Sequence, residues 1–164
     1  MAWVGSTVTE QVVSLLSAPQ GLNGCIATLA QAGNAVLAQV GEEQLFTQNV
    51  SMEIMERSFD VKYPSICVYC ERIVNQLKEK FRNFSGKAIM AIEVRVSQDR
   101  LEGIGEQSQM YLDAVTQVLD QNRGDWGEGV YFAGSYDASL TPVKHGGRNF
   151  IQIGKVTFEV GVSD

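Results

Sequence analysis

The most constraining feature of the sequence is the alternation over residues 86–98, "GKAIMAIEVRVSQ". The apolar side chains share one side of an extended chain: Ala88, Met90, Ile92, Val94 and Val96. The polar side chains Glu93, Arg95 and Ser97 share the other side. Because the pattern has a period of two, it predicts a half-buried β-strand. The chain must therefore build a sheet, and a second layer must cover the apolar face of that sheet.

Residues 99–122 supply a candidate for the covering layer. Apolar and small side chains recur there at helical spacing: Leu101, Ile104, Ser108, Tyr111, Leu112, Val115, Val118 and Leu119. Gly124 follows as a C-terminal stop signal. We expect this helix to lie on the apolar face of the predicted strand, with Tyr111, Leu112, Val115 and Leu119 in contact with it.

The N-terminal sixty residues favour helices. Thr7 and Glu10 have the spacing of a capping box that opens a first helix, which Pro19 and Gly21 end. Residues 22–40 repeat the helical period, although two internal glycines weaken the pattern. Alternation of Val50, Met52 and Ile54 predicts a short strand.

The remaining segments favour strands and turns. "SICVYCERI" (residues 65–73) is rich in β-branched and aromatic residues and predicts a strand. Residues 71–85 fit either a helix or a long hairpin, and the hairpin is favoured because strands flank the segment. "GDWGEG" predicts a turn, residues 130–140 a strand, residues 141–149 a turn or hairpin tip, and residues 150–162 a last strand with a bulge at Gly154.

Short turns between neighbouring strands predict an α+β fold, a mostly antiparallel sheet with a long helix packed on one face. At 164 residues the chain is expected to form one domain. Within it, residues 1–60 form a helical segment and connecting strand, and residues 61–164 form the sheet-plus-helix core.

The pair Cys67 and Cys70 raises the question of a metal site, because Cys25 and His145 would complete a Cys₃His set. On a strand, however, two residues three apart point to opposite faces. Their Cα atoms would be about 10 Å apart, beyond the roughly 7 Å limit for a disulfide. We therefore expect no metal and no cofactor, with one cysteine facing the core and the other facing a second layer.

The net charge and the absence of known motifs argue against nucleic-acid binding, membrane association and catalysis. The formal charge of −6, from 19 acidic and 13 basic residues, argues against a broad nucleic-acid interface. The first residues lack a signal-peptide pattern, and the apolar runs are too short to span a membrane, so no membrane partner is expected. No phosphate loop is recognisable, and the neighbours of His145 are basic or glycine, so we expect no enzymatic activity.

From Lys62 onward the chain resembles the tail terminator and neck (head–tail joining) proteins of tailed bacteriophages. The segments that carry the resemblance are "KYPSICVYCERI", "KFRNFSGKAIMAIEVRVSQDRLEG", "MYLDAV", "RGDWGEGVYFAGSYDASL" and "VKHGGRNFIQIGKVTFEVGVS". The resemblance implies a terminator-like fold and a structural virion protein of the tail and neck, assembled in the host cytoplasm. Such a protein forms a ring, usually hexameric, that caps the tail tube and joins it to the neck.

The resemblance also implies partners. They are further copies of the chain, the tail tube protein, a neck connector or stopper protein, and a sheath protein if the tail is contractile. Genome DNA would pass through the lumen without specific binding. A head-side connector or stopper ring is the alternative within phage necks, and an enzyme or small-molecule binder on a ferredoxin-like sheet is the alternative from another class.

Two groups of residues are candidates for an interface. "VKHGGRNF" gathers positive charge at the predicted hairpin tip, with Lys144, His145, Arg148 and Asn149 around the pair Gly146–Gly147. We expect this tip to dock on an acidic surface of a neighbouring subunit or neck partner, with Arg148 as a donor to a carboxylate. The second group is Glu93 and Arg95, predicted to point outward and to match charges across a ring interface.

Overall fold

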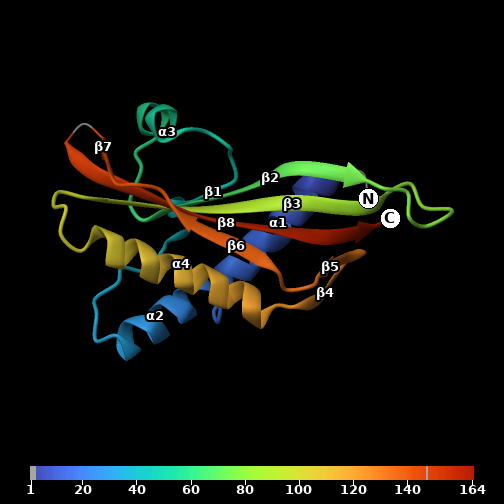
Figure 1. Cartoon of the computed structure of the whole chain (residues 1–164), viewed down its shortest axis with the longest axis horizontal. Helices are drawn as coiled ribbons and strands as arrows, with labels where there is room; N and C mark the ends of the chain where they lie inside the picture. The colour runs from blue at the N-terminus through green and yellow to red at the C-terminus, as the bar shows by residue number, and fades with distance from the viewer. Residues whose placement is uncertain (1–2, 147) are drawn as a thin grey trace.

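The strand β3 (Ser85–Gln98) is the centre of the sheet in the computed structural model of the chain, which describes residues 3–146 and 148–164 (Figure 1). It lies antiparallel between β2 (Ser65–Asn75) and β8 (Asn149–Ser163). The even-numbered side chains of β3 from Ala88 to Val96 are buried in the main core. The strand predicted from alternation is therefore confirmed.

The other strands extend this sheet on both sides. They are β1 (Leu45–Phe46), β4 (Gly124–Gly127), β5 (Val130–Phe132), β6 (Tyr136–Leu140) and β7 (Lys144–Gly146). β5, β6 and β7 all pair with β8, and β4 pairs with β5. The sheet is mixed because β1 runs parallel to β2. "GDWGEG", predicted as a turn, contributes β4 before its turn.

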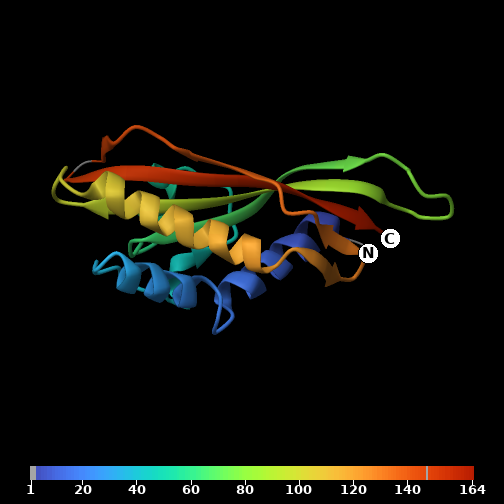
Figure 2. The same ribbon diagram turned by 60° about the horizontal axis from the view of Figure 1, so that its bottom comes forward.

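Four helices accompany the sheet in the described part of the chain. They are α1 (Val4–Ser17), α2 (Leu22–Ala32), α3 (Met52–Ser58) and α4 (Ile104–Gln121). Figure 2 shows α1, α2 and α4 beneath one face of the sheet. The α+β class is confirmed, but the finer expectation of a mostly antiparallel sheet with one long helix on a face is corrected: the sheet is mixed, and α1 and α2 bury side chains in the same core as α4.

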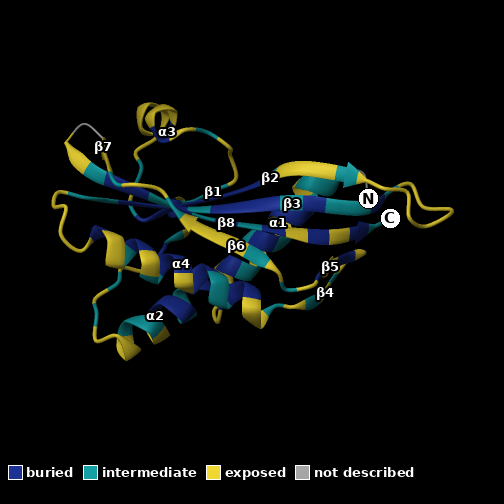
Figure 3. Cartoon of the chain, in the orientation of Figure 1, coloured by how far each residue is buried: buried dark blue, intermediate teal, exposed yellow. Residues whose placement is uncertain are grey.

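The predicted contact between α4 and β3 is confirmed. Tyr111, Leu112, Val115 and Leu119 belong to the buried cluster that contains the apolar face of β3. Buried side chains of α1, α2 and β8 complete that cluster, so both predicted segments, 1–60 and 61–164, contribute to one core. Figure 3 shows the buried residues concentrated on the middle strands and on the helix sides that face them.

The two N-terminal helices differ from the prediction in extent. α1 begins at Val4, so Thr7 lies inside the helix, where its backbone N–H donates to the Trp3 carbonyl at 2.9 Å. The predicted capping box is therefore wrong. α2 ends at Ala32, because Asn34 adopts a φ of 48° that leaves the helix.

No single helix among the described residues is long and apolar enough to cross a membrane. The pair α1 and α2, joined at a 41° bend, meets that requirement only when the two helices are taken together, by length and composition alone.

The strand predicted around residues 50–54 is wrong, because these residues lead into α3. Met52 and Met55 are three apart, so a helix places both side chains on the side that faces the sheet, where both are buried. Met55 packs on the outer face of the sheet with Cys67, Tyr69 and Ala91. This second, smaller cluster holds α3 on the face opposite α1 and α4.

The favoured hairpin over residues 71–85 is confirmed. β2 and β3 pair up to Asn75 opposite Gly86, and residues 76–84, which we call the arm, connect them. Figures 1 and 2 show the arm projecting beyond the rest of the molecule. It lies at the end of the sheet farthest from β7.

The bulge predicted at Gly154 is wrong. Pairing between β3 and β8 runs without a shift from Ser85 opposite Ser163 to Gln98 opposite Phe150. A Cβ atom at position 154 would lie 3.0 Å from Leu112 Cδ1 and 3.2 Å from Leu140 Cδ2. The glycine therefore lets α4 and β6 approach the sheet closely, and the inward face of β8 does not change.

Candidate functional site

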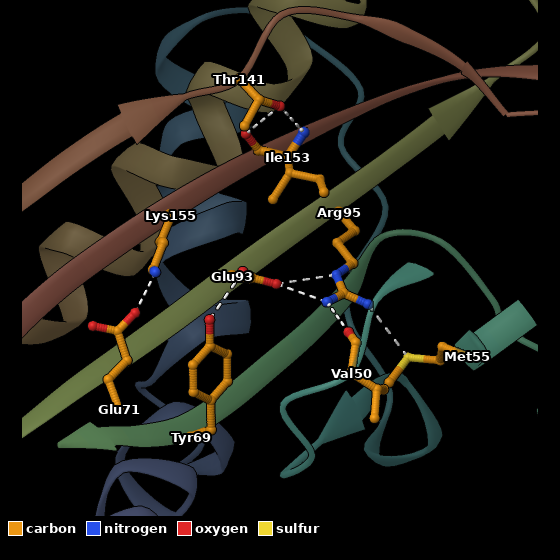
Figure 4. A network of polar contacts seen from close by, with 9 residues as sticks. All are labelled: Val50, Met55, Tyr69, Glu71, Glu93, Arg95, Thr141, Ile153 and Lys155. Carbon is orange, nitrogen blue, oxygen red and sulfur yellow. Dashed lines mark hydrogen bonds and ion pairs between the residues drawn. The ribbon is translucent and has the colours of Figure 1, made fainter. Parts of the chain in front are cut away.

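The outer face of the sheet, opposite α4, carries a polar network centred on Glu93 and Arg95 (Figure 4). Both side chains point away from the main core, as their odd positions on β3 predict. The part of this face that holds Arg95 is not open to solvent, however. Residues 41–60, which we call the cap and which include α3, pass over it, and Arg95 is 3% exposed.

Arg95 ties the cap to the sheet. Its Nη2 donates to Glu93 Oε2 at 2.7 Å and to the Val50 carbonyl at 2.6 Å. Nε donates to the same Glu93 oxygen at 3.2 Å, and Nη1 lies 3.7 Å from Met55 Sδ. A buried guanidinium needs such partners to offset its loss of hydration. Arg95 therefore points outward from the core as predicted, but its side chain is engaged by residues of its own chain, and its role across a ring interface stays a prediction.

Glu93 also accepts a hydrogen bond from Tyr69 Oη at 3.0 Å. Burial, followed by the charge of Glu93, raises the pKa of the Tyr69 hydroxyl well above its usual range. Next to it, Lys155 pairs with Glu71 and lies 5.9 Å from the centre of the Tyr69 ring. Strands β2, β3 and β8 are thus linked by charged groups on this face, and an uncharged Tyr69 donates to the carboxylate.

A groove of about 760 Å³ opens between the cap and the β7–β8 hairpin. Its floor and walls include Glu93, Arg95, Lys144 and His145, four of the six residues predicted as interface candidates. The structure therefore brings together two groups that the sequence analysis treated as separate. Arg148 and Asn149 do not line the groove; both are exposed at the end of the hairpin.

The walls of the groove carry both charges beside apolar side chains. Glu53 and Glu56 come from α3, with Arg57 next to them, and Lys144 comes from the opposite side. The pKa of Glu53 is lowered by its own backbone N–H and by the Ser51 hydroxyl, and to a lesser degree by Lys144 and Arg95.

The predicted hairpin tip is confirmed over the residues that the structure describes. Lys144 pairs with Ile151, and Gly146 pairs with Asn149. Gly147, half of the glycine pair noted in the sequence, lies outside the described residues. His145 packs edge-on against Phe150, with ring centres 5.4 Å apart. Lys144, His145 and Arg148 are exposed, so the tip presents its positive charge to solvent.

The cysteines take the positions predicted for a strand. Cys67 is buried in the outer cluster, whereas Cys70 packs at the edge of the main core on the other face. Burial raises the pKa of the Cys67 thiol to about 11. Among residues 3–146 and 148–164, no three His, Cys, Asp or Glu side chains are placed to hold one metal ion.

Sequence reasoning missed the part of the site that the cap supplies. Ser51, Met52, Glu53 and Glu56 line the groove, yet the segment was predicted as a strand. A helix signal was present: Ser51 precedes a first turn that contains Glu53, and Met52 and Met55 repeat at helical spacing. Tyr69 was placed on a strand, but its hydrogen bond to Glu93 depends on strand register, which the sequence did not give.

No model of a known protein family matches the chain, and no curated protein matches it either. Neither search therefore identifies a family for this protein.

Proposed function

We propose that this protein is a structural virion protein of a tailed bacteriophage, a tail terminator that forms a ring on the end of the tail tube. The observation that carries the proposal is the element order after residue 62. A long hairpin, β2–β3, is followed by the helix α4 and then by the strands β4 to β8. The family that the sequence resembles implies two strands, then a helix, then a closing pair of strands, and β2, β3 and α4 follow that order. A terminator-like sheet with α4 along one face is part of the same proposal.

The polar groups favour a structural role rather than a catalytic one. Arg95 and Glu93 bind the cap to the sheet, and Tyr69 completes that network. His145 packs against an aromatic ring instead of a carboxylate. The charged groups of this network and the Tyr69 hydroxyl thus hold the cap on the sheet. We infer that the protein works by assembly.

In this role the partners are further copies of the chain in a hexameric ring, the tail tube protein and a neck connector or stopper protein. A sheath protein joins them where the tail is contractile. The protein would reside in the virion, at the junction of tail and neck. The exposed β7–β8 tip, with Lys144 and Arg148, is the part of the chain we assign to a contact with an acidic neighbour.

The negative charge of the chain supports the proposal that DNA passes through the lumen of the ring without binding to it. Six copies of a chain with a formal charge of −6 carry −36, so a lumen that shares this acidity repels phosphate. The ring is expected not to bind duplex DNA at physiological salt in a filter-binding assay. A salt-dependent, tight affinity would contradict this part of the proposal.

Negative-stain microscopy tests the function directly. The purified protein is mixed with tail tubes that lack their terminator, and rings are expected at one end of each tube. Density on the portal side of isolated heads, with bare tube ends, would instead assign the protein to the head-side connector or stopper. Absence of the protein from both structures would overturn a neck function.

A further inference from the structure

The arm, residues 76–84, exposes the most solvent-accessible aromatic side chain of the described molecule. Phe81 is 103% exposed, and Leu77 on the same tip is 65% exposed. Both also have a positive φ, 67° and 47°, which is unfavourable for bulky residues. Single apolar residues on a surface are ordinary, but two on one projecting tip with strained backbone mark a contact surface.

The arm is also basic. It contains Lys78, Lys80 and Arg82 against one acid, Glu79, a formal charge of +2 from three positive and one negative residue. Glu79 is already engaged by Arg82, at 3.4 Å, and by the Ser163 hydroxyl, at 2.9 Å. Lys78 and Lys80 make no ion pair with any described residue. The tip therefore offers two unpaired ammonium groups beside an exposed aromatic ring.

The cap has the opposite character. Residues 41–60 contain five carboxylates and one cationic side chain, Arg57, which gives a formal charge of −4. Two large apolar side chains of the cap, Ile54 and Phe59, are exposed. The adjacent groove adds apolar lining from Met52, Ile151 and Ile153. At about 760 Å³ it falls within the range of roughly 300–1,000 Å³ that protein binding sites occupy.

The arm projects from one end of the molecule, whereas α3 and β7 lie in the other half, so an arm cannot reach the groove of its own chain (Figure 1). We propose that the arm of one copy docks in the groove beside the cap of the next copy. Phe81 enters the groove, and Lys78 and Lys80 lie along its α3 wall, away from Lys144, and pair with Glu53 and Glu56. The contact is heterologous, so it repeats from copy to copy and closes into a ring where the rotation allows. The assignment of a second copy of the chain as the partner rests on the proposed ring function.

The test measures self-association by sedimentation velocity over a range of protein concentrations. Phe81→Asp is expected to weaken association at least about 30-fold, as for the loss of a central interface residue. Val36→Asp is the matched control, because Val36 is 98% exposed but belongs to neither surface; it is expected to leave association unchanged. Circular dichroism checks that each variant is folded, and the outlying position of both residues predicts that it is.

Charge exchange makes the test specific. Lys78→Glu with Lys80→Glu removes the basic side of the contact, and Glu53→Lys with Glu56→Lys removes the acidic side. Each pair alone is expected to abolish assembly, and all four changes in one chain are expected to restore it. In a mixture of the two double variants, the basic arm of one meets the acidic groove of the other, and the reversed pair is complementary as well, so the mixture is expected to assemble with the two kinds of copy alternating.

Three outcomes would overturn the inference. They are normal assembly of Phe81→Asp, equal weakening by Val36→Asp, and failure of the fourfold variant to assemble. If these variants cap tail tubes as well as the wild type does, the arm contact is wrong and the terminator function stands. If the wild type assembles through the arm but never binds tubes, the arm contact stands and the terminator function is wrong.

Discussion

Arg95→Met removes the buried guanidinium that joins the cap to the sheet and keeps a long side chain in its place. Three interactions are lost: the ion pair with Glu93, the hydrogen bond to the Val50 carbonyl and the contact of Nη1 with Met55 Sδ. The side chains of Arg95 and Glu93 are only 4% and 16% exposed, so the Glu93 carboxylate is left largely buried without its cation. Breaking a buried pair in this way costs about 3–5 kcal/mol. Because Tyr69 still donates to Glu93, we expect a value near the lower end, about 3 kcal/mol.

The assay is urea denaturation, with the free energy of unfolding taken from the midpoint and slope. Hydrogen exchange adds a local measurement, since amides of the cap are expected to exchange faster when Arg95 no longer holds it. Adding Glu93→Gln to Arg95→Met is expected to recover part of the lost stability, because the second change removes the uncompensated charge.

Lys87→Met is the matched control. Lys87 lies on the same strand and pairs with Glu159 at 2.8 Å, close to the 2.7 Å of the Arg95–Glu93 pair. Its side chain is 32% exposed and that of Glu159 is 56% exposed, so solvent screens the pair. We expect its loss to cost less than about 1 kcal/mol. If Arg95→Met costs no more than Lys87→Met, the buried pair does not hold the cap, and the reasoning fails.

Four further predictions follow from the core, the hairpin and the thiols. Ile92→Ala is expected to lower the free energy of unfolding by about 2–5 kcal/mol in urea titrations, and a loss below about 1 kcal/mol would contradict its place in the core. Gly154→Ala is expected to cost about 1–3 kcal/mol because the added methyl group crowds Leu112 of α4 and Leu140 of β6, and an unchanged midpoint would show that these side chains can move aside. Lys144→Glu with Arg148→Glu is expected to leave the melting temperature nearly unchanged but to abolish head–tail joining in a complementation assay; full infectivity would remove the tip from the interface. Because burial raises the pKa of the Cys67 thiol from its ordinary 9.0 to about 11, the native state keeps a proton that the unfolded chain loses. Stability is therefore expected to fall as pH rises from 9.0 toward 11, less steeply in Cys67→Ala, and equal slopes would refute this.

The centre of the fold was predictable because its local pattern and its tertiary environment agree. The alternation of β3 and the helical stripe of α4 are long, regular and buried on the side that the period indicates. Ile92 and Leu119 therefore lie in the core, as the sequence predicted. A pattern that extends over several turns or several residue pairs is hard to satisfy in any other way.

The cap was not predictable in the same way because α3 has seven residues. Over so short a segment, Val50, Met52 and Ile54 fit a strand by coincidence, whereas Met52 and Met55 fit a helix. Packing decides between the two, since only the helix buries both methionines against the outer face of the sheet. The choice depends on the presence of that face, which comes from residues later in the chain.

The groove depends even more on long-range structure. It combines residues 49–57 with Glu93, Arg95 and the β7–β8 hairpin, segments that no local motif connects. The sequence indicated that Glu93 and Arg95 share a polar side of a strand, and this is correct. The sequence could not indicate that the cap covers them. The pattern of a polar strand face is the same whether its arginine is hydrated or donates to a backbone carbonyl.

The sheet also fixes how far apart the arm and the groove lie. β3 and β8 pair without a break along their length, and the arm is held at its base by the chain end: Asn83 N–H donates to the Asp164 carbonyl at 2.8 Å, and Asp164 N–H donates to the Phe84 carbonyl at 2.8 Å. The same two strands carry the far end of the groove, through Arg95 on one and Ile151 on the other. A continuous ladder of backbone hydrogen bonds thus joins the two surfaces and leaves no hinge between them. Each copy would hold its neighbour at the same distance and rotation, which is the condition for a heterologous contact to close into a ring of fixed size instead of an irregular chain.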